Sequence, residues 1–419
     1  MPAVSQQMRD AAEIREAFSD APGLYIHIPF CATICPFCPY NKVRHESGLA
    51  RRYLLALRQE MDAYIEQGFA EFESLYVGGG TPTLCIQGLA DVLQGLSIKG
   101  ERAIEVLPIH ATPARIHRMR DLGFNYISLG VQSFNDKLLR YLRRPHKAAQ
   151  NYRALENVRG EFDCIDVDLI FDVAFEDEQV FLNDLHICFA AGVDQVSTYP
   201  LMRFGYTPFG KSAHRPDEEH RLLRRATEMA ESFGYERRSV WTFNKVDTPS
   251  YTSITREFYL GCGAGAGSFS GSIFFLNHFS VGKYINAVES GRLPIARRTR
   301  LRRETAAAYY LFWQLYTGML DPHRFAQHFP EETALSLALD MARLAGYLRE
   351  EGGVYFLTDR GYEVYHDLER WVTYHFIEPL WADMMREHES DLDDYQLPGL
   401  ADQLLLQLIG LNDTGRGLH

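Results

Sequence analysis

The sequence predicts an α/β protein whose core is a parallel sheet, closed only part of the way into a barrel. The first half of the chain repeats one pattern: a short β-rich run, a loop, and a segment with helical periodicity. Strands that alternate with helices in this way form parallel sheets. The pattern occurs six times, whereas a closed barrel of this kind has eight units. We therefore expect a partial (β/α)6 TIM-like barrel.

Each element of this barrel is predicted from its own residues. The strands are expected at 24–28, 74–77, 103–107, 126–129, 165–171 and 195–199. The helices are expected at 51–67, 87–93, 113–122, 136–142, 148–158, 178–191 and 218–233. The helix at 51–67 is the clearest, because its large apolar residues share one face and Gly68 ends it.

The pattern changes after residue 234. Segments 235–243 and 268–275 are predicted strands that extend the sheet, and the chain from residue 304 on is mostly helical. There, a helix at 337–348, a short hairpin and a helix at 359–368 are typical of a winged-helix-like module, which we expect to pack against the barrel mouth. A last helix is expected at 397–409. The predicted division is a leader at 1–22, the partial barrel at 23–234, a β extension beside the cofactor at 235–300 and a C-terminal helical domain at 301–419.

Composition excludes several classes of protein. Lysine and arginine number 43 against 55 aspartates and glutamates, so the net charge is −12 and a nucleic-acid surface is not expected. No apolar run reaches the ~18 residues of a membrane span, and residues 1–20 lack a signal-peptide core. The seven cysteines are an odd number and mostly scattered, which suits a reducing cytosol rather than a disulfide framework. We therefore expect a cytoplasmic protein without a membrane or nucleic-acid partner.

Three cysteines stand together just after the first predicted strand, at Cys31, Cys35 and Cys38. Thiolates are soft ligands that hold iron–sulfur clusters. A 4Fe–4S cluster has four corners, so three cysteines leave one iron open to a substrate or a cofactor. The alternatives are three incidental core cysteines or a zinc site, whose fourth ligand could be His27 or His45.

The spacing CxxxCxxC after YIHIPFC, together with GGGTP at 78–82, resembles the signature of the radical S-adenosylmethionine (SAM) superfamily. The resembled branch contains oxygen-independent coproporphyrinogen dehydrogenase, the heme chaperones and the class C radical SAM methyltransferases. The resemblance runs from about residue 25 to about residue 358. It implies that SAM chelates the open iron and that one electron cleaves SAM to a 5′-deoxyadenosyl radical.

The same resemblance implies which residues bind SAM. Phe37 matches a position that packs on the adenine, and a plain loop hydrophobe is the alternative. Glu105 is a carboxylate that needs a partner if buried, either a ligand or a structural salt bridge. Arg144 suits a SAM carboxylate, with a surface ion pair as the alternative. The predicted cofactor-binding set is Tyr25, Phe37, Gly79, Gly80, Thr81, Glu105, Gln132, Arg144, Asp168, Ile170, Met202 and Gly267.

Three differences guide the choice within the branch. The dehydrogenase carries a further cysteine where this chain has Tyr40, and the chain lacks its long N-terminal arm. The HNxxYW motif of the heme chaperones is not reproduced at 249–254. The chain is therefore most similar to the class C methyltransferases. That similarity implies two SAM molecules and transfer of a methyl or methylene group to an sp² carbon of a conjugated natural-product substrate, giving methylation or cyclopropanation.

Other roles follow from position. Tyr40, His110 and Tyr199 are candidates for the group that handles a proton. The substrate is expected to contact residues at the strand ends: Phe171, Asp172, Arg203, Phe204, Trp241 and Phe243. A flavodoxin- or ferredoxin-type protein is the expected electron donor. The basic run at 297–303 is interpreted as a solvated helix start, with an acidic-partner surface as the alternative.

Two other functions stay open. The first alternative is a heme-utilisation radical SAM methyltransferase that opens a tetrapyrrole ring, because a planar heme would also suit an aromatic-rich barrel mouth. The second is a non-catalytic heme chaperone, which would bind heme without cleaving SAM.

Overall fold

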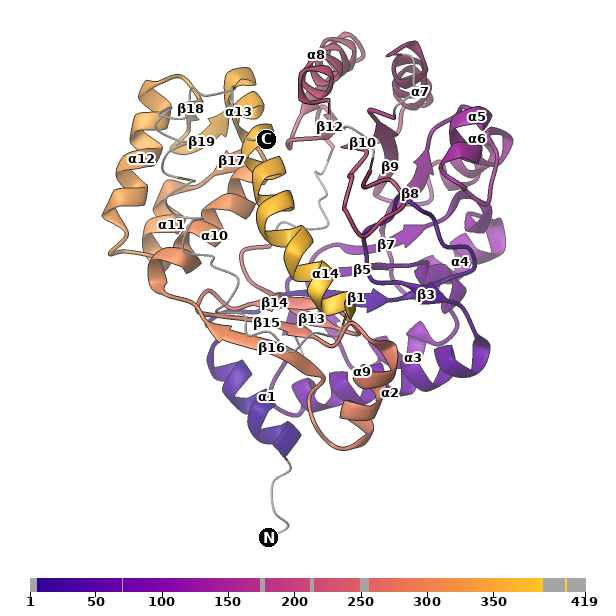
Figure 1. Ribbon diagram of the computed structural model, residues 1–419, viewed down its shortest axis with the longest axis vertical. Helices are drawn as coiled ribbons and strands as arrows, with labels where there is room; N and C mark the ends of the chain where they lie inside the picture. Colours follow the sequence, from indigo (N-terminus) through magenta and orange to yellow (C-terminus); the bar gives the residue numbers. More distant parts are fainter. Residues whose placement is uncertain are drawn as a thin grey trace.

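The computed structural model describes residues 6–69, 71–173, 178–211, 215–248, 256–386 and 404. Its core is a 12-stranded sheet in the order β11-β12-β10-β9-β8-β7-β5-β1-β13-β14-β15-β16 (Figure 1). The six strands of the barrel are β1 (Gly23–Ile28), β5 (Leu75–Gly79), β7 (Arg102–Val106), β8 (Tyr126–Gln132), β9 (Cys164–Phe171) and β10 (Gln195–Pro200). Each pairs in parallel with its neighbour in this set, which confirms the predicted α/β class and the partial barrel.

Helices alternate with these strands as predicted. They are α2 (Ser47–Ile65), α3 (Leu89–Leu93), α4 (Pro113–Asp121), α5 (Asp136–Tyr141), α6 (Ala148–Val158), α7 (Glu178–Ala191) and α8 (Pro216–Ser232). The N-terminal helix α1 (Gln6–Glu16) packs against α2. No helix in the described part of the chain combines the length and apolar character that a membrane span needs.

One end of the barrel interior is plugged. Because side chains alternate between the two faces of a strand, every second residue points inward. Five side chains, one from each of five neighbouring strands, pack together and fill one layer of the interior: Tyr25, Tyr76, Ala103, Tyr126 and Cys164. Two residues further along three of these strands, the same face carries the polar residues Glu105, Ser128 and Asp166. The polar level lies toward the carboxyl ends of the strands, where barrels of this type carry their chemistry.

The β extension differs in detail from the prediction. Segment 235–243 was expected as one strand, but β11 (Tyr235–Arg237) and β12 (Thr242–Lys245) form an antiparallel pair. Segment 268–275 is likewise divided between β14 (Gly267–Phe269) and β15 (Ile273–Asn277). Gly271, at φ 88°, allows the second turn, since this region of φ favours glycine. Hydrophobic periodicity does not reveal a tight turn inside an apolar run.

Other strands and one helix complete this region. β13 (Tyr259–Cys262) pairs in parallel with β1 and antiparallel with β14. The helix α9 (Val281–Glu289) packs on α2. Two short pairs lie outside the large sheet, β2 (Phe30–Cys31) with β3 (Val43–Arg44) and β4 (Glu71–Phe72) with β6 (Ser97–Ile98).

The basic run at 297–303 is not a solvated helix start, and that prediction was wrong. It mostly belongs to β16 (Ile295–Arg300), which pairs with β15 at the edge of the sheet, where charged side chains discourage further pairing. Arg298 forms an ion pair with Glu13 at 2.6 Å, and Arg303 forms one with Glu331 at 2.6 Å. Two arginines of the run are therefore engaged within the molecule.

The C-terminal part is mainly helical, as predicted. It comprises α10 (Arg303–Tyr316), α11 (Pro322–His328), α12 (Thr333–Leu344), α13 (Asp359–Val372) and α14 (Glu378–Arg386), with a small sheet of β17 (Met319–Leu320), β18 (Leu348–Glu351) and β19 (Val354–Leu357). A π-helical turn at Thr373–Ile377 joins α13 to α14. The winged-helix likeness and the domain boundaries stay predictions. The predicted helix at 397–409 lies outside the described residues, apart from Leu404.

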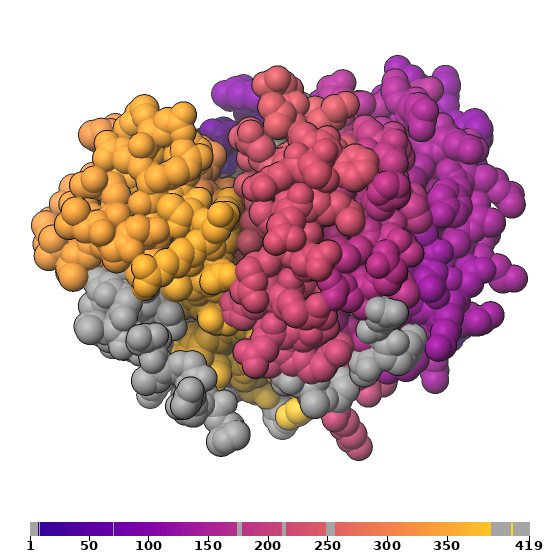
Figure 2. Space-filling view, turned by 90° about the horizontal axis from the view of Figure 1, so that it is seen from above, coloured from indigo at the N-terminus to yellow at the C-terminus, as the bar shows by residue number. Residues whose placement is uncertain are grey.

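The last described helix reaches back to the barrel. In Figure 1 the yellow helix α14 crosses in front of the sheet, and Figure 2 shows the orange and yellow C-terminal part against the red segment around residues 200–245. Met384 of α14 packs with Leu276 and Phe279 beside β15. This helix therefore spans from the C-terminal part to the β extension.

Candidate functional site

The three cysteines lie on one loop between β1 and α2, closed at its base by the β2–β3 pair. Within it, the Cys38 N–H donates to the Cys35 carbonyl at 3.4 Å, and Lys42 Nζ donates to the Cys38 carbonyl at 2.6 Å. Burial raises the pKa of the Cys31 thiol to about 11; the Thr81 hydrogen bond lowers this pKa, while Cys38 and Cys35 act in the same direction as burial. The three sulfurs thus lie close enough to influence one another, and a bound metal would take them as thiolates.

The zinc alternative does not fit this loop. The His27 ring is engaged at both nitrogens: Nδ1 contacts the Tyr25 hydroxyl at 2.7 Å and Nε2 donates to the Asn41 carbonyl at 2.9 Å. His45 packs edge-on against Phe30. Within the described ranges, no three His, Cys, Asp or Glu side chains are grouped to hold a metal ion. Cysteines around a cluster bind different irons, so they stand further apart than the ligands of one ion.

Two side chains from distant parts of the chain donate to cysteine sulfurs. Thr81 Oγ1 donates to Cys31 Sγ at 3.7 Å, across 50 residues of sequence. Arg144 Nη1 donates to Cys35 Sγ at 3.4 Å, across 109 residues. Hydrogen bonds to sulfur orient cluster ligands and tune the potential of the cluster, so these donors fit the cluster interpretation.

The glycine segment after β5 brings its backbone against the cysteine loop. Gly79 has φ 116°, in the region that favours glycine. A Cβ added at Gly80 would lie 2.7 Å from the carbonyl oxygen of Phe30, closer than a real Cβ approaches. The Gly79 N–H donates to Glu105 Oε2 at 3.1 Å. The glycines thus allow the backbone of this segment to pack closely against the cysteine loop, and this glycine cradle contacts the Glu105 carboxylate through the Gly79 N–H.

Glu105 accepts hydrogen bonds but forms no ion pair with any residue that the structure describes. Besides the Gly79 N–H, the Tyr76 hydroxyl donates to Glu105 Oε1 at 2.7 Å. Across the described chain no ion pair reaches Glu105, so the salt-bridge alternative has no support. Burial and the charge of Asp168 together raise the pKa of Glu105 to about 8, although the hydrogen bond from the Gly79 N–H lowers it. A cationic ligand would favour the ionised carboxylate.

Gln132 and Arg144 meet at Gly130. Arg144 Nη2 donates to the Gly130 carbonyl at 2.6 Å, and a Cβ on Gly130 would lie 3.3 Å from both Arg144 Nη2 and Gln132 Nε2. Gln132 has φ 68° at an irregularity of β8, and such strain concentrates at functional sites. Arg144 Nε is buried without a hydrogen-bond partner among the described atoms. The side chain forms no ion pair there, so a ligand carboxylate fits better than the surface ion-pair alternative.

Asp168 faces the same interior from β9. Ser128 Oγ donates to Asp168 Oδ2 at 2.6 Å, and burial raises the pKa of Asp168 to about 6 against the opposing effects of Ser128 and Arg144. Asp166 lies one level deeper, where Ser197 Oγ donates to it at 3.0 Å and burial raises its pKa strongly. These two carboxylates fit hydroxyl or cationic groups of a ligand.

The other predicted cofactor residues lie in different parts of the barrel and its extension. Phe37 packs with the group containing Ile170, so these two are brought together near the cysteine loop. Met202 is partly exposed at the end of β10, and Tyr25 belongs to the apolar plug. Gly267 lies on β14, two strands from β1, where a Cβ on Gly261 would collide with its carbonyl oxygen. This contact explains why residue 261 is a glycine, whereas a Cβ on Gly267 would lie 3.1 Å from the end of the Leu276 side chain. A role of Gly267 in cofactor binding stays a prediction.

Of the proton-handling candidates, Tyr40 and Tyr199 share the interior with Asp168. Tyr40 is 53% exposed, yet desolvation raises its pKa, as do the charges of Glu105, Cys38 and Asp168. Burial and Asp168 also raise the pKa of Tyr199. His110 is instead buried against Thr83 at 2.7 Å, and desolvation lowers its pKa to about 4. The geometry therefore favours the two tyrosines over His110.

An aromatic cover lies over the cysteine loop, formed by Tyr40, Phe204 and Trp381. The ring centroids of Tyr40 and Trp381 lie 5.7 Å apart, and Phe204 stacks on Trp381 at 6.2 Å. Next to Phe204, the Tyr206 hydroxyl donates to the Pro39 carbonyl at 3.2 Å. The α14 helix thereby closes onto the loop that carries the cysteines.

Most of the predicted substrate-lining residues do not line this space. Phe171 and Phe243 are fully buried in the core, and Phe171 stacks on Phe181 of α7. They lie on strand faces that point to the helices, so the prediction for them was wrong. Asp172 and Arg203 form a buried ion pair at 2.7 Å. Trp241 is also buried and donates from Nε1 to His366. Phe204 alone of the predicted set joins the aromatic cover.

Several site residues were not predicted. Lys42 and Asn41 follow the cysteines directly, and Asn41 Nδ2 donates to the carbonyls of Ala264 and Phe279 at 3.0 and 2.8 Å. Their position in the loop was a usable signal. Tyr76 and Trp381 had none, because nothing local distinguishes them from core aromatic residues.

Comparison with known proteins defines the class. The radical SAM superfamily model matches residues 25–184. The chain is 30% identical over 289 residues to heme chaperone HemW of Lactococcus lactis, covering 63% of this chain and 73% of that protein. It is 28% identical over 295 residues to anaerobilin synthase of Escherichia coli O157:H7, covering 65% and 66%. The structure of coproporphyrinogen III oxidase (HemN) from Escherichia coli has the same fold, with a TM-score of 0.72 at 22% identity over 87% of this chain and 93% of that one.

The chain belongs to the radical SAM superfamily. Within it, the chain falls in the branch of the HemW heme chaperones and the oxygen-independent coproporphyrinogen III oxidases. The cofactors of this family, a 4Fe–4S cluster and SAM, are those that the sequence predicts, and the glycine cradle and the acidic interior fit them. Radical SAM enzymes also use an electron donor and a small-molecule substrate. The second SAM molecule stays a prediction.

The predicted methylation or cyclopropanation of a natural product is wrong. The relatives are named for heme, anaerobilin and coproporphyrinogen, and the expected likeness to class C methyltransferases is not supported. That prediction rested on the absence of two features, the further cysteine of the dehydrogenase and the HNxxYW motif of the heme chaperones. A missing motif excludes one arrangement of residues, but it does not establish a different substrate.

Proposed function

We propose that this chain is a radical SAM enzyme whose substrate is a tetrapyrrole. The observation that carries the proposal is the aromatic cover, Tyr40, Phe204 and Trp381, over the loop of the three cysteines. Aromatic side chains bind planar conjugated rings by stacking. The names of the relatives support the same substrate class.

We assign Cys31, Cys35 and Cys38 as the cluster ligands. These residues would hold a 4Fe–4S cluster, which when bound would supply the electron for cleavage of SAM and so start radical chemistry on a substrate. Around that site the chain would position SAM by charge. Arg144 would bind the carboxylate of SAM through its free donor, and Glu105 would accept a hydrogen bond from the amino group of SAM.

Asp168 is the best-placed acceptor for the ribose hydroxyls, because it lies on the inner face of β9 with a second oxygen free of Ser128. Tyr40 and Tyr199 stay protonated at neutral pH, because the ordinary pKa of tyrosine is about 10 and the charge of Asp168 raises the pKa of both, so they would donate hydrogen bonds to the substrate. The cover helix α14 would keep water from the radical.

Anaerobic turnover tests this proposal. Reconstituted protein is reduced and incubated with SAM and either heme or coproporphyrinogen III, and 5′-deoxyadenosine and tetrapyrrole products are quantified by mass spectrometry. We expect one of the two tetrapyrroles to increase the rate of SAM cleavage on the order of tenfold. The same tetrapyrrole should be converted to product as 5′-deoxyadenosine accumulates. The proposal fails if neither compound changes the rate and neither is modified.

A second candidate is heme binding without catalysis, favoured by the 30% identity to HemW of Lactococcus lactis. It predicts tight, stoichiometric heme binding in the same experiment, with heme recovered unchanged and SAM cleavage unaffected. Glu105 and Arg144 support the enzyme instead. Neither forms an ion pair in the described chain, and a protein that only carries heme has no use for buried charged groups that could bind SAM.

A further inference from the structure

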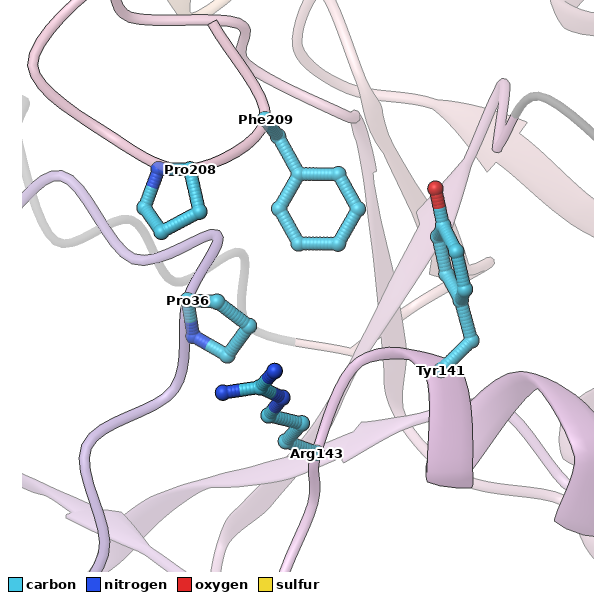
Figure 3. A pocket seen from close by; sticks show the side chains of 5 residues that line it. All are labelled: Pro36, Tyr141, Arg143, Pro208 and Phe209. Atoms are coloured by element: carbon cyan, nitrogen blue, oxygen red, sulfur yellow. The ribbon is translucent and has the colours of Figure 1, made fainter.

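We propose that a hollow beside the cysteine loop is the docking surface of the acidic one-electron carrier protein that reduces the cluster. The hollow has a volume of about 380 Å³ and is lined by Pro36, Tyr141, Arg143, Pro208 and Phe209. Figure 3 shows the Arg143 guanidinium beside the Pro36 ring, with the rings of Phe209 and Tyr141 around the same space. The inference rests on the assignment of the three cysteines to the cluster.

The hollow is directly joined to the cluster site. Pro36 follows Cys35 in the chain, and Arg144, which donates to Cys35 Sγ at 3.4 Å, follows Arg143. Ile34, on the other side of Cys35, is 37% exposed, so the loop is open to solvent here. Electron transfer slows steeply with distance, and a carrier must therefore bind at a face close to the cysteines.

The barrel mouth does not offer that face. Trp381 of α14 contacts Tyr40, and the Tyr206 hydroxyl donates to the Pro39 carbonyl, so the C-terminal part and the segment after β10 cover the loop from this direction. A protein carrier would have to displace them. The hollow needs no such displacement, because it already lies between exposed side chains of two other loops.

Charge selects an acidic partner. Arg140 and Arg143 are exposed, and neither guanidinium has a hydrogen-bond or ion-pair partner in the parts of the chain that the structure describes. Arg143 has φ 52° because it is the left-handed residue that ends α5: its N–H donates to the Arg140 carbonyl at 3.1 Å, and the Arg144 N–H donates to the Leu139 carbonyl at 2.9 Å. On a chain of net charge −12, these two arginines form a local positive site.

The apolar part of the hollow has the composition of a protein interface. Tyr141 is 38% exposed and its ring meets the ring of Phe209 edge-on at 5.1 Å. Tyrosine and arginine are enriched among the residues that contribute most to protein binding. The basic run at 297–303 is a weaker candidate, since two of its arginines already form ion pairs.

The proposed step is a single electron transfer. The reduced carrier loses one electron and the oxidised cluster gains it, while no covalent bond of this chain forms or breaks. Flavodoxin meets the requirement, because it is a small acidic protein that carries one electron on FMN.

Binding of FMN-loaded flavodoxin is the first test. The double variant Arg140→Glu/Arg143→Glu is compared with Arg153→Glu/Arg159→Glu, which changes the net charge equally at exposed arginines near α6. Biolayer interferometry at low and physiological salt should show affinity weakened on the order of tenfold or more in the first variant, with a smaller salt dependence. The second variant should resemble the parent.

Cluster reduction is the second test. Bleaching of cluster absorbance and SAM cleavage without any tetrapyrrole are followed with flavodoxin or with dithionite as reductant. We expect the first variant to lose on the order of tenfold in rate with flavodoxin and to match the parent with dithionite. Because no tetrapyrrole is present, an error in the proposed substrate would not change this result.

Three results would overturn the docking proposal. One is equal flavodoxin affinity of both variants and the parent. Another is an equal loss with dithionite, which would assign the hollow to the SAM site or to a small ligand. The third is a parent protein that binds neither flavodoxin nor an acidic 2Fe–2S ferredoxin.

Discussion

Arg144 and Cys35 lie 109 residues apart in the chain, yet Arg144 Nη1 donates to the Cys35 sulfur at 3.4 Å. The same guanidinium donates through Nη2 to Gly130 at the end of β8, at 2.6 Å. One side chain therefore joins the cysteine loop to the barrel wall. Its remaining buried donor, Nε, is the group that we assign to the carboxylate of SAM.

Replacing Arg144 should weaken SAM binding while the cluster is retained. Arg144→Lys keeps the charge but loses the planar set of donors, so we expect SAM affinity to fall about 10- to 100-fold, or about 1.4–2.8 kcal/mol. Equilibrium dialysis with the reconstituted protein measures this. Arg143→Lys is the matched control and should bind SAM like the parent. Unchanged affinity in Arg144→Lys would contradict the assignment.

Each cysteine of the loop should be required for the cluster. In Cys31→Ala, Cys35→Ala or Cys38→Ala, bound iron should fall from about four per chain to a small fraction of that value, with loss of visible absorbance and of the paramagnetic signal. Cys85→Ala is the control, because Cys85 is buried outside the loop. Full iron content in any of the three variants would remove that cysteine from the ligand set.

SAM binding should release a proton near neutral pH. The pKa of Glu105 is raised to about 8 without ligand, so the carboxyl is mostly protonated at pH 7, and the N–H donors and sulfonium charge of bound SAM favour the ionised form. Affinity should therefore rise as pH increases from about 6 to 8 and level off above that range. Calorimetry in buffers of different ionisation enthalpy counts the protons. Glu105→Gln should abolish the release, and an unchanged count would refute this role.

Trp381 should matter for the tetrapyrrole and not for SAM. Trp381→Ala removes the partner of Tyr40 and Phe204, so we expect tetrapyrrole affinity to fall on the order of tenfold. SAM cleavage without a tetrapyrrole should stay unchanged. Trp371→Ala is the control, since that ring stacks on His375. Equal tetrapyrrole affinity in both variants would argue against the aromatic cover as the binding surface.

The stability of the fold should depend on the ionisation of Glu60. This residue is fully buried on α2, and desolvation raises its pKa to about 7 although Tyr284, Gly263 and Asn277 donate to it. The folded state thus holds the proton more tightly than the unfolded state, whose carboxyl titrates near 4.3. Its contribution is fully present below about pH 4.3 and is lost as pH rises to about 7.

Thermal unfolding measures this contribution. Because Glu60→Gln cannot ionise, its midpoint should rise relative to the parent between pH 5 and pH 7.5. Glu66→Gln, at the C-terminal end of the same helix, should show no such trend. Parallel curves for the parent and Glu60→Gln would mean that Glu60 does not titrate in this interval.

Local patterns were sufficient for the barrel and for the cysteine loop. The sequence by itself determined the six strands, because alternation within a strand and helical periodicity depend on neighbouring residues. It also determined the cluster ligands as candidates, since three cysteines within eight positions share one loop. Errors occurred where a short turn divides an apolar run, as at Gly271.

Only the tertiary structure decided which residues surround that loop. Phe171 and Phe204 were equal candidates from sequence, but strand orientation buries the first against α7 and packing places the second against Trp381. Likewise, nothing local to Arg144 indicates the sulfur of Cys35. Such contacts join segments far apart in the chain, so they depend on how the whole barrel and its cover pack.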